Sequence, residues 1–170
     1  NHYEISKRLE SFHEHNEKEK TEEVLQRLQQ GEKIALVSDA GMPGISDPGG
    51  WLIRRAIDEG LPCEILPGAN AALVAYLQSG FPSPQFAFYG FLPRKKGQRQ
   101  AELASLKDLA FPIIFYEAPH RLAATLAELA QVLGGERRAV LCRELTKLHE
   151  EIARAALGEP QVIRAVGSGE

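Results

Sequence analysis

The chain has 170 residues, of which 44% are hydrophobic and 25% are charged, and its formal net charge is -3. These values predict an ordinary globular protein with one generous core or two small ones. They exclude a basic field over the whole surface, so a nucleic-acid partner would have to meet a local basic patch. No apolar stretch reaches the roughly 20 residues of a membrane helix, and the start lacks a signal-peptide core. We therefore expect a cytoplasmic protein without a membrane partner.

The first half of the sequence alternates between helix-like and strand-like segments. Apolar residues recur with helical spacing in three segments: 21–30, 49–60 and 71–78. Two short apolar runs predict buried strands: 33–38 and 63–66. This β-α-β-α alternation favours a mainly parallel sheet with helices on its faces.

Two prolines in residues 80–85 predict a domain boundary, which gives an N-terminal α/β domain of residues 1–81 and a C-terminal α/β domain of residues 82–170. In the second domain, three segments are strand-like: 86–91, 112–117 and 137–145. Two are helix-like: 101–110 and 118–135. Between the first strand and the first helix, residues 93–100 predict a loop rich in basic side chains, and residues 149–166 predict a short helix and a last strand. We expect mainly parallel or mixed sheets and a ligand cleft between two domains.

Cys63 and Cys142 stand in apolar, strand-like runs, without a second cysteine or a histidine at metal-ligand spacing. We expect two reduced core thiols and no metal site.

The loop "LVSDAGMPGISDPG" (36–49) lies where parallel sheets bind ligands, after a predicted strand and before a helix. Its glycines allow a close approach of the backbone to a ligand, and its prolines stiffen it. It lacks the Lys-Ser/Thr ending of a P-loop, and the carboxylates of Asp39 and Asp47 would repel phosphate. A neutral or cationic ligand such as a sulfonium therefore fits better. The alternative is a tight structural turn in which Asp47 caps the next helix.

Two further loops follow predicted strands in the same manner, "LPGAN" (66–70) and "FYEAPHR" (115–121). Because such loops gather at one edge of an α/β fold, they predict one shared pocket.

The motifs "VSDAGMPGISDPG", "LPGANAALVAYLQSGFP", "FAFYGFLPRKKGQR", "FYEAPHRL" and "LCRELTKLHEE", preceded by "SFHEHNE", follow one another in a characteristic order. In this order they resemble the 16S ribosomal RNA methyltransferases among the tetrapyrrole-methylase-like (class III) S-adenosylmethionine methyltransferases. The resemblance implies a two-domain α/β fold that binds S-adenosylmethionine in its cleft. It also implies methylation of a cytidine ribose 2′-hydroxyl in 16S rRNA of the small ribosomal subunit, and a homodimer.

The resemblance also assigns residues. The implied cofactor-binding residues are Asp39, Ala40, Gly41, Met42, Ile45, Ser46, Asn70, Ala71, Tyr116, Glu117 and Ala118. Compared with the family pattern, the given sequence lacks an opening strand and glycine-rich loop. It has "PGAN" where PGPS is common, and its tail departs from the expected closing strand.

Methyl transfer to a hydroxyl is helped by a general base, for which Glu117 and Glu144 are the candidates, with His13 and Lys147 behind them. The structural alternatives are that Glu117 caps the helix beginning at Pro119, and that Glu144 pairs with Arg143 or Lys147.

Basic residues that would contact RNA phosphates are concentrated in the loop around 94–99 and continue beyond it: Arg94, Lys95, Lys96, Arg99, Arg121, Arg143 and Lys147. The alternative is a solvated charged face. Residues 13–17, "HEHNE", lack a third metal ligand, so we favour an RNA or dimer contact over a metal site there.

Two other functions stay open at this point. One is a methylase of a tetrapyrrole or another small substrate. The other is an inactive dimerisation or RNA-binding module that kept the fold.

Overall fold

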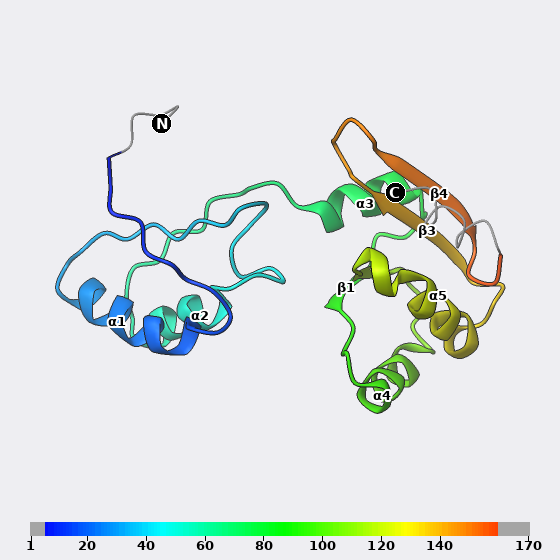
Figure 1. Cartoon of the computed structure of the whole chain (residues 1–170), viewed down its shortest axis with the longest axis horizontal. Coiled ribbons are helices and arrows are strands. Elements are labelled where there is room, and N and C mark those ends of the chain that lie inside the picture. The colour runs from blue at the N-terminus through cyan, green and yellow to red at the C-terminus, as the bar shows by residue number, and fades with distance from the viewer. Residues whose placement is uncertain (1–5, 160–170) are drawn as a thin grey trace. The chain divides into compact units, whose positions relative to one another are not determined.

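The computed structural model describes residues 6–159, and the chain divides into two compact units, Asn1–Asn70 and Ala71–Glu170. We call them the first and the second unit and describe each by itself (Figure 1). The boundary between the units lies eleven residues before the domain boundary at 81 that the prolines suggested, and the two domains remain a prediction.

The first unit is organised around two helices, α1 (Glu17–Gln29) and α2 (Gly50–Asp58), which pack against each other. Their apolar stripes form a small core: Val24, Leu25, Leu52 and Ala56. α1 begins four residues before the predicted helix, because the polar residues Glu17–Lys20 make its first turn. Glu17 and Glu19 suit that end of the helix, where the dipole is positive.

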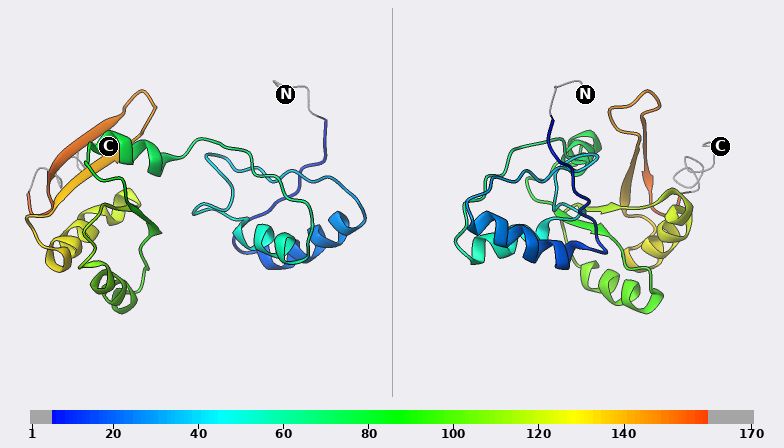
Figure 2. Two further views of the ribbon diagram at one scale, coloured as in Figure 1. Left: turned by 180° about the vertical axis from the view of Figure 1, so that it is seen from behind. Right: turned by 60° about the vertical axis from the view of Figure 1, so that its left-hand side comes forward.

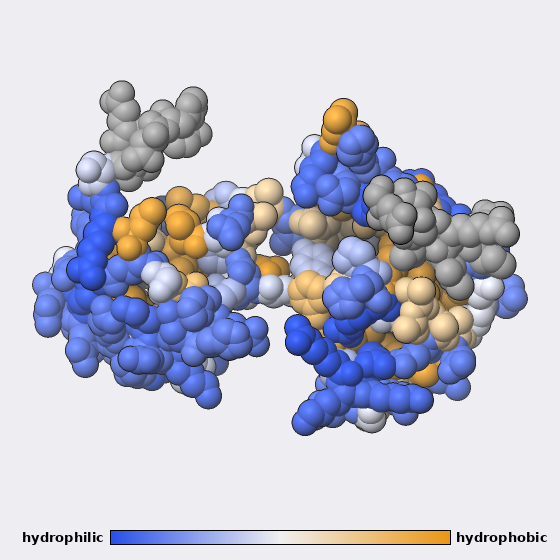
Figure 3. Space-filling model, viewed as in Figure 1, coloured by the Kyte–Doolittle hydropathy of each residue, from blue (hydrophilic) through white to orange (hydrophobic). Residues whose placement is uncertain are grey.

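The strands predicted at 33–38 and 63–66 are wrong: these described residues run as open chain (Figure 1). A strand is defined by hydrogen bonds to a neighbouring strand, and no strand is assigned in the described part of the first unit. Ile34 and Leu36 still pack on the helix core, but Val37 is 76% exposed and Leu66 is 71% exposed. Figure 3 shows the resulting apolar patch on the first unit, away from α1 and α2. Cys63, expected in a core, is exposed for the same reason.

Up to residue 159, where the description ends, the second unit holds seven elements: α3 (Ala71–Ser79), β1 (Ala87–Phe91), α4 (Lys96–Leu106), β2 (Ile113–Tyr116), α5 (Pro119–Leu133), β3 (Arg138–Arg143) and β4 (Glu151–Ala156). β1 and β2 pair in parallel, and β3 and β4 form an antiparallel hairpin (Figure 2). The register of β1 shifts between Phe88 and Gly90, where Gly90 takes a φ of 73° that favours glycine. The predicted mixed α/β class is confirmed, with a parallel and an antiparallel sheet.

Five leucines form the core of the second unit: Leu92, Leu103, Leu126, Leu129 and Leu157. They join α4 and α5 to the ends of β1 and β4, and Leu103 is fully buried.

Two further sequence predictions for the second unit are wrong. The tail segment predicted as a short helix is β4, because its residues pair across the hairpin with β3. The predicted helix at 101–110 begins instead at Lys96, so Arg99 lies in α4 and not in a loop.

Candidate functional site

The loop of residues 39–49 in the first unit is folded back on itself by its own backbone. Gly44 N–H donates to the Pro48 carbonyl (3.1 Å), and Ile45 N–H donates to the Met42 carbonyl (3.3 Å). Gly41 and Gly44 have φ values of 79° and 82°, which favour glycine. Asp39 and Asp47 are exposed, so their carboxylates are accessible to a ligand.

This loop lies against the second predicted ligand loop, residues 66–70. A Cβ atom on Gly41 would stand 3.3 Å from the Ala69 carbonyl oxygen, and one on Gly68 would stand 3.2 Å from Met42 Cγ. Both distances are shorter than ordinary van der Waals contact, so glycine at these two positions lets the two loops approach. The structure therefore brings together the two ligand loops that the sequence predicted in this unit.

The loop is anchored at α2 by a residue that the sequence did not single out. Glu17 Oε1 accepts a hydrogen bond (2.8 Å) from the N–H of Gly49, the N-cap residue of α2. The alternative in which Asp47 caps this helix is therefore not what the structure has. Gly49 itself is buried with a φ of 124°, and a Cβ there would lie 2.5 Å from Leu36 Cδ2.

Residues 13–17 hold the start of α1. Asn16 Oδ1 accepts from the His13 N–H (2.8 Å), and Asn16 Nδ2 donates to the Ser11 carbonyl (3.1 Å).

Within residues 6–159 no group of three His, Cys, Asp or Glu side chains is placed to hold a metal ion. Nor does any helix in that range have the length and apolar character needed to cross a membrane.

The third predicted ligand loop, Tyr116–Ala118, belongs to the second unit. Tyr116 ends β2 with its ring edge-on to Phe88 (5.1 Å between centroids) and Phe91 (5.6 Å). Asn70 is the last residue of the first unit and Ala71 the first of α3.

Glu117 is almost enclosed, with a side chain only 6% exposed. Its carboxylate accepts from the Ala118 N–H (2.8 Å) and the Thr125 hydroxyl (2.7 Å), and Arg121 lies 3.3 Å away. This geometry matches the helix-capping alternative, since Ala118 is the N-cap residue of α5. The role of Glu117 as a base or a cofactor ligand stays a prediction.

Glu144, the other candidate base, is in the turn between β3 and β4 with a left-handed φ of 48°. Its side chain is 45% exposed and lies 3.2 Å from Lys147 Nζ, so the predicted alternative pairing with Lys147 is present. Arg143 lies 3.8 Å from the Glu151 carboxylate.

Five of the predicted RNA-binding residues of the second unit fall into two groups. Arg94, Lys95 and Lys96 are exposed at the start of α4. Arg99 and Arg121 instead have mostly buried side chains, 14% and 22% exposed, that bond to other parts of the unit. Arg99 pairs with Glu128, and the hydrogen bond from Arg99 holds the pKa of Glu128 below its usual range.

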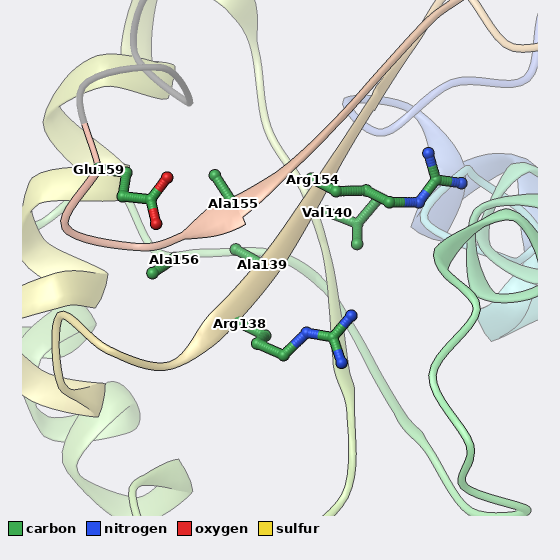
Figure 4. A pocket seen from close by; sticks show the side chains of 7 residues that line it. All are labelled: Arg138, Ala139, Val140, Arg154, Ala155, Ala156 and Glu159. Carbon is green, nitrogen blue, oxygen red and sulfur yellow. The ribbon is translucent and has the colours of Figure 1, made fainter.

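A hollow of about 290 Å³ lies on the β3–β4 hairpin (Figure 4) and contains none of the predicted site residues. The Arg138 guanidinium lies over the Phe81 ring (5.6 Å to its centroid), and Arg154 donates to the Gln78 carbonyl at the end of α3. Arg138 thus contacts the segment after α3, and Arg154 contacts the last turn of α3.

The sequence profile of the tetrapyrrole (corrin/porphyrin) methylases matches residues 1–161, so the chain belongs to this family. The fold agrees: the crystal structure of the methyltransferase CobJ is similar with a TM-score of 0.65 at 19% identity, over 94% of this chain and 74% of that one.

Closer in sequence are proteins named ribosomal RNA small subunit methyltransferase I. That of Halalkalibacterium halodurans is 48% identical over 94% of this chain and 55% of its own length. That of Bacillus subtilis is 48% identical over 92% and 53%. That of Thermotoga maritima is 45% identical over 94% and 71%. The resemblance drawn from the motifs is confirmed, and the chain spans about half the length of most of these relatives.

Proposed function

We propose that this chain is part of an S-adenosylmethionine-dependent methyltransferase that methylates the ribose 2′-hydroxyl of a cytidine in 16S rRNA. The observation that carries the proposal is the contact between the two glycine loops of the first unit, at Gly41 and Gly68. The names of the relatives support the substrate class.

The residues of these loops fit the proposed cofactor. Glycine at 41 and 68 lets the two loops lie in close contact, and the carboxylates of Asp39 and Asp47 suit hydroxyl, ammonium or sulfonium groups. The residues proposed to hold S-adenosylmethionine are Asp39, Ala40, Gly41, Met42, Ile45, Ser46, Asn70 and Ala71, with Tyr116, Glu117 and Ala118 as the proposed third contact. When bound, this cofactor supplies a methyl group activated by positive sulfur.

The chain's own part in the reaction is alignment and proton removal. The 2′-oxygen forms a bond to the methyl carbon while the carbon–sulfur bond breaks, its electron pair remains on sulfur, and the hydroxyl proton passes to a base. Of the two candidate carboxylates, Glu144 is the exposed one, and Glu117 is bonded to the Ala118 N–H and to Thr125 of α5. We therefore favour Glu144 as the base and a positioning role for Glu117.

The exposed cations Arg94, Lys95 and Lys96 are proposed to contact RNA phosphates, with Arg143 and Lys147 extending the track. A homodimer and a cytoplasmic location complete the proposal.

Transfer of labelled methyl from S-adenosylmethionine to small ribosomal subunits that lack the modification tests the proposal. The full-length protein that contains this chain should label one cytidine, located by mapping the labelled nucleotide. Label on free tetrapyrrole but not on subunits would favour the alternative substrate. Donor binding by calorimetry without transfer to either would contradict an active methyltransferase.

The same assay separates the two carboxylates. Glu144→Gln should lower the transfer rate about 100-fold or more if Glu144 is the base. Glu117→Gln should instead lower the thermal stability of the second unit. Full activity of Glu144→Gln would remove it as the base.

A further inference from the structure

The backbone that carries the exposed cations is held by two other arginines. We call residues 93–96 the basic loop; it leads from β1 into α4. Arg99 Nη1 donates to the carbonyls of Pro93 and Arg94, both at 3.0 Å. Arg121 Nη2 donates to the carbonyl of Leu92 (3.2 Å). Three consecutive carbonyls are thus bonded to guanidinium groups that come from α4 and α5.

The other edge of the Arg99 guanidinium is bound by Glu128 of α5. Nε lies 2.5 Å from Oε2 and Nη2 lies 2.7 Å from Oε1, and the side chains are 14% and 19% exposed. A planar guanidinium can serve a carboxylate on one edge and backbone carbonyls on the other, whereas an ammonium cannot reproduce this fork. Glu128 therefore fixes the orientation in which Arg99 reaches the basic loop.

The placement of Glu128 is electrostatically unexpected on an RNA-binding surface. Its carboxylate lies among cations, and Arg99, Lys96 and Arg121 all act to lower its pKa. If the surface only attracted phosphate, a carboxylate here would reduce the attraction. The first turn of α4 contains no acid that would offset the basic residues at that helix end. A carboxylate at position 128 is explained if its role is to hold Arg99 in place.

We propose that Arg99 and Glu128 are positioning residues, which hold the basic loop so that Arg94, Lys95 and Lys96 meet RNA phosphates without further ordering. The proposal rests on the proposed RNA substrate. It differs from the sequence prediction, in which Arg99 contacts RNA directly. A loop fixed beforehand binds more tightly, because the ordering cost is not met during association.

The two possible roles of Arg99 predict opposite changes in the affinity of one variant, Glu128→Ala, for small ribosomal subunits. If Glu128 positions the loop, Glu128→Ala weakens binding to small ribosomal subunits about threefold to tenfold, the effect of ordering one or two side chains on binding. If Arg99 contacts phosphate itself, the same variant strengthens binding, since it removes a carboxylate and frees the cation. Arg99→Lys should weaken binding nearly as much as Arg99→Ala in the first case, and far less in the second.

A second measurement does not depend on RNA. Arg94, Lys95 and Lys96 are sites for trypsin, and cleavage of a native protein follows the local opening of its chain. Glu128→Ala and Arg99→Lys should each raise the rate of cleavage within the basic loop several-fold. Glu136→Ala, which removes an exposed carboxylate elsewhere in the second unit, is the matched control and should change neither cleavage nor binding.

Faster cleavage with weaker subunit binding supports the proposal, provided that circular dichroism shows both variants folded. Unchanged cleavage in both variants overturns the proposal, whatever the RNA binding. Faster cleavage with unchanged binding also overturns it when the triple alanine variant of Arg94, Lys95 and Lys96 loses binding. If that triple variant binds normally as well, the basic loop has no RNA role, and this part of the proposed function fails with the inference.

Discussion

Short apolar runs form strands in the second unit but not in the first. In the second unit the predicted strands at β1, β2 and β3 all form, because each has a hydrogen-bonded neighbour. In the first unit the equally apolar segments 33–38 and 63–66 stay open, and their outer side chains are exposed. A short apolar run thus sets the propensity for a strand, and a partner decides whether the strand exists. The first unit consequently depends on two helices and on side-chain contacts to its ligand loops.

The largest expected effect is in the leucine core of the second unit. Leu103→Ala should destabilise this unit by about 2–5 kcal/mol, since Leu103 is fully buried among the other core leucines. Hydrogen exchange of the β1 and β2 amides would measure it. Trp51, the chain's one tryptophan, reports on the first unit by fluorescence. Equal shifts of both signals in urea would show that the two units unfold together.

An intermediate effect is expected at the anchor of the first unit. Glu17→Ala removes the acceptor of the Gly49 N–H and should destabilise this unit by about 1–2 kcal/mol, as for a lost helix cap. The Trp51 fluorescence transition in urea would measure the change. Glu19→Ala is the matched control, because Glu19 stands in the same first turn of α1 and is exposed. Similar losses in both variants would reduce the role of Glu17 to a helix-dipole effect. Weaker donor binding in Glu17→Ala alone would extend that role to the ligand loop.

The smallest expected effect is on the pH dependence of the stability of the second unit. The hydrogen bond from Arg99 holds the pKa of Glu128 below its ordinary value of 4.5. The stability from this pair is therefore fully present above pH 4.5 and is lost as the pH falls through the lowered pKa of the folded state. Acid should accordingly reduce the stability of the second unit less in Glu128→Gln than in the parent protein. Identical acid sensitivity of the two proteins, by hydrogen exchange of β1, would contradict the pairing.

Local sequence signals predicted the helices and most strands of the second unit. The alternation in residues 86–91 predicted β1, and in the first unit the helical pattern of residues 49–60 predicted α2. The tail was misassigned, because helical and strand spacing both fit residues 149–157 and only pairing with β3 decides between them.

The candidate site could be predicted only in part. Glycine and proline marked the ligand loops, because their backbone preferences are local. The contacts that hold these loops were not predictable, since Gly49 meets a carboxylate 32 residues earlier in the chain and Arg99 meets one 29 residues later. No local pattern encodes such pairs, which exist only after the helices have packed.

Gly49 has a consequence for redesign of the ligand loop. Any side chain at this position would collide with Leu36, which packs on the core of the first unit, so a larger residue there would have to rebuild that core. A library that seeks altered cofactor preference should therefore leave position 49 untouched. It should vary Ile45, because this side chain is 42% exposed and can be replaced without a change in the core of the first unit.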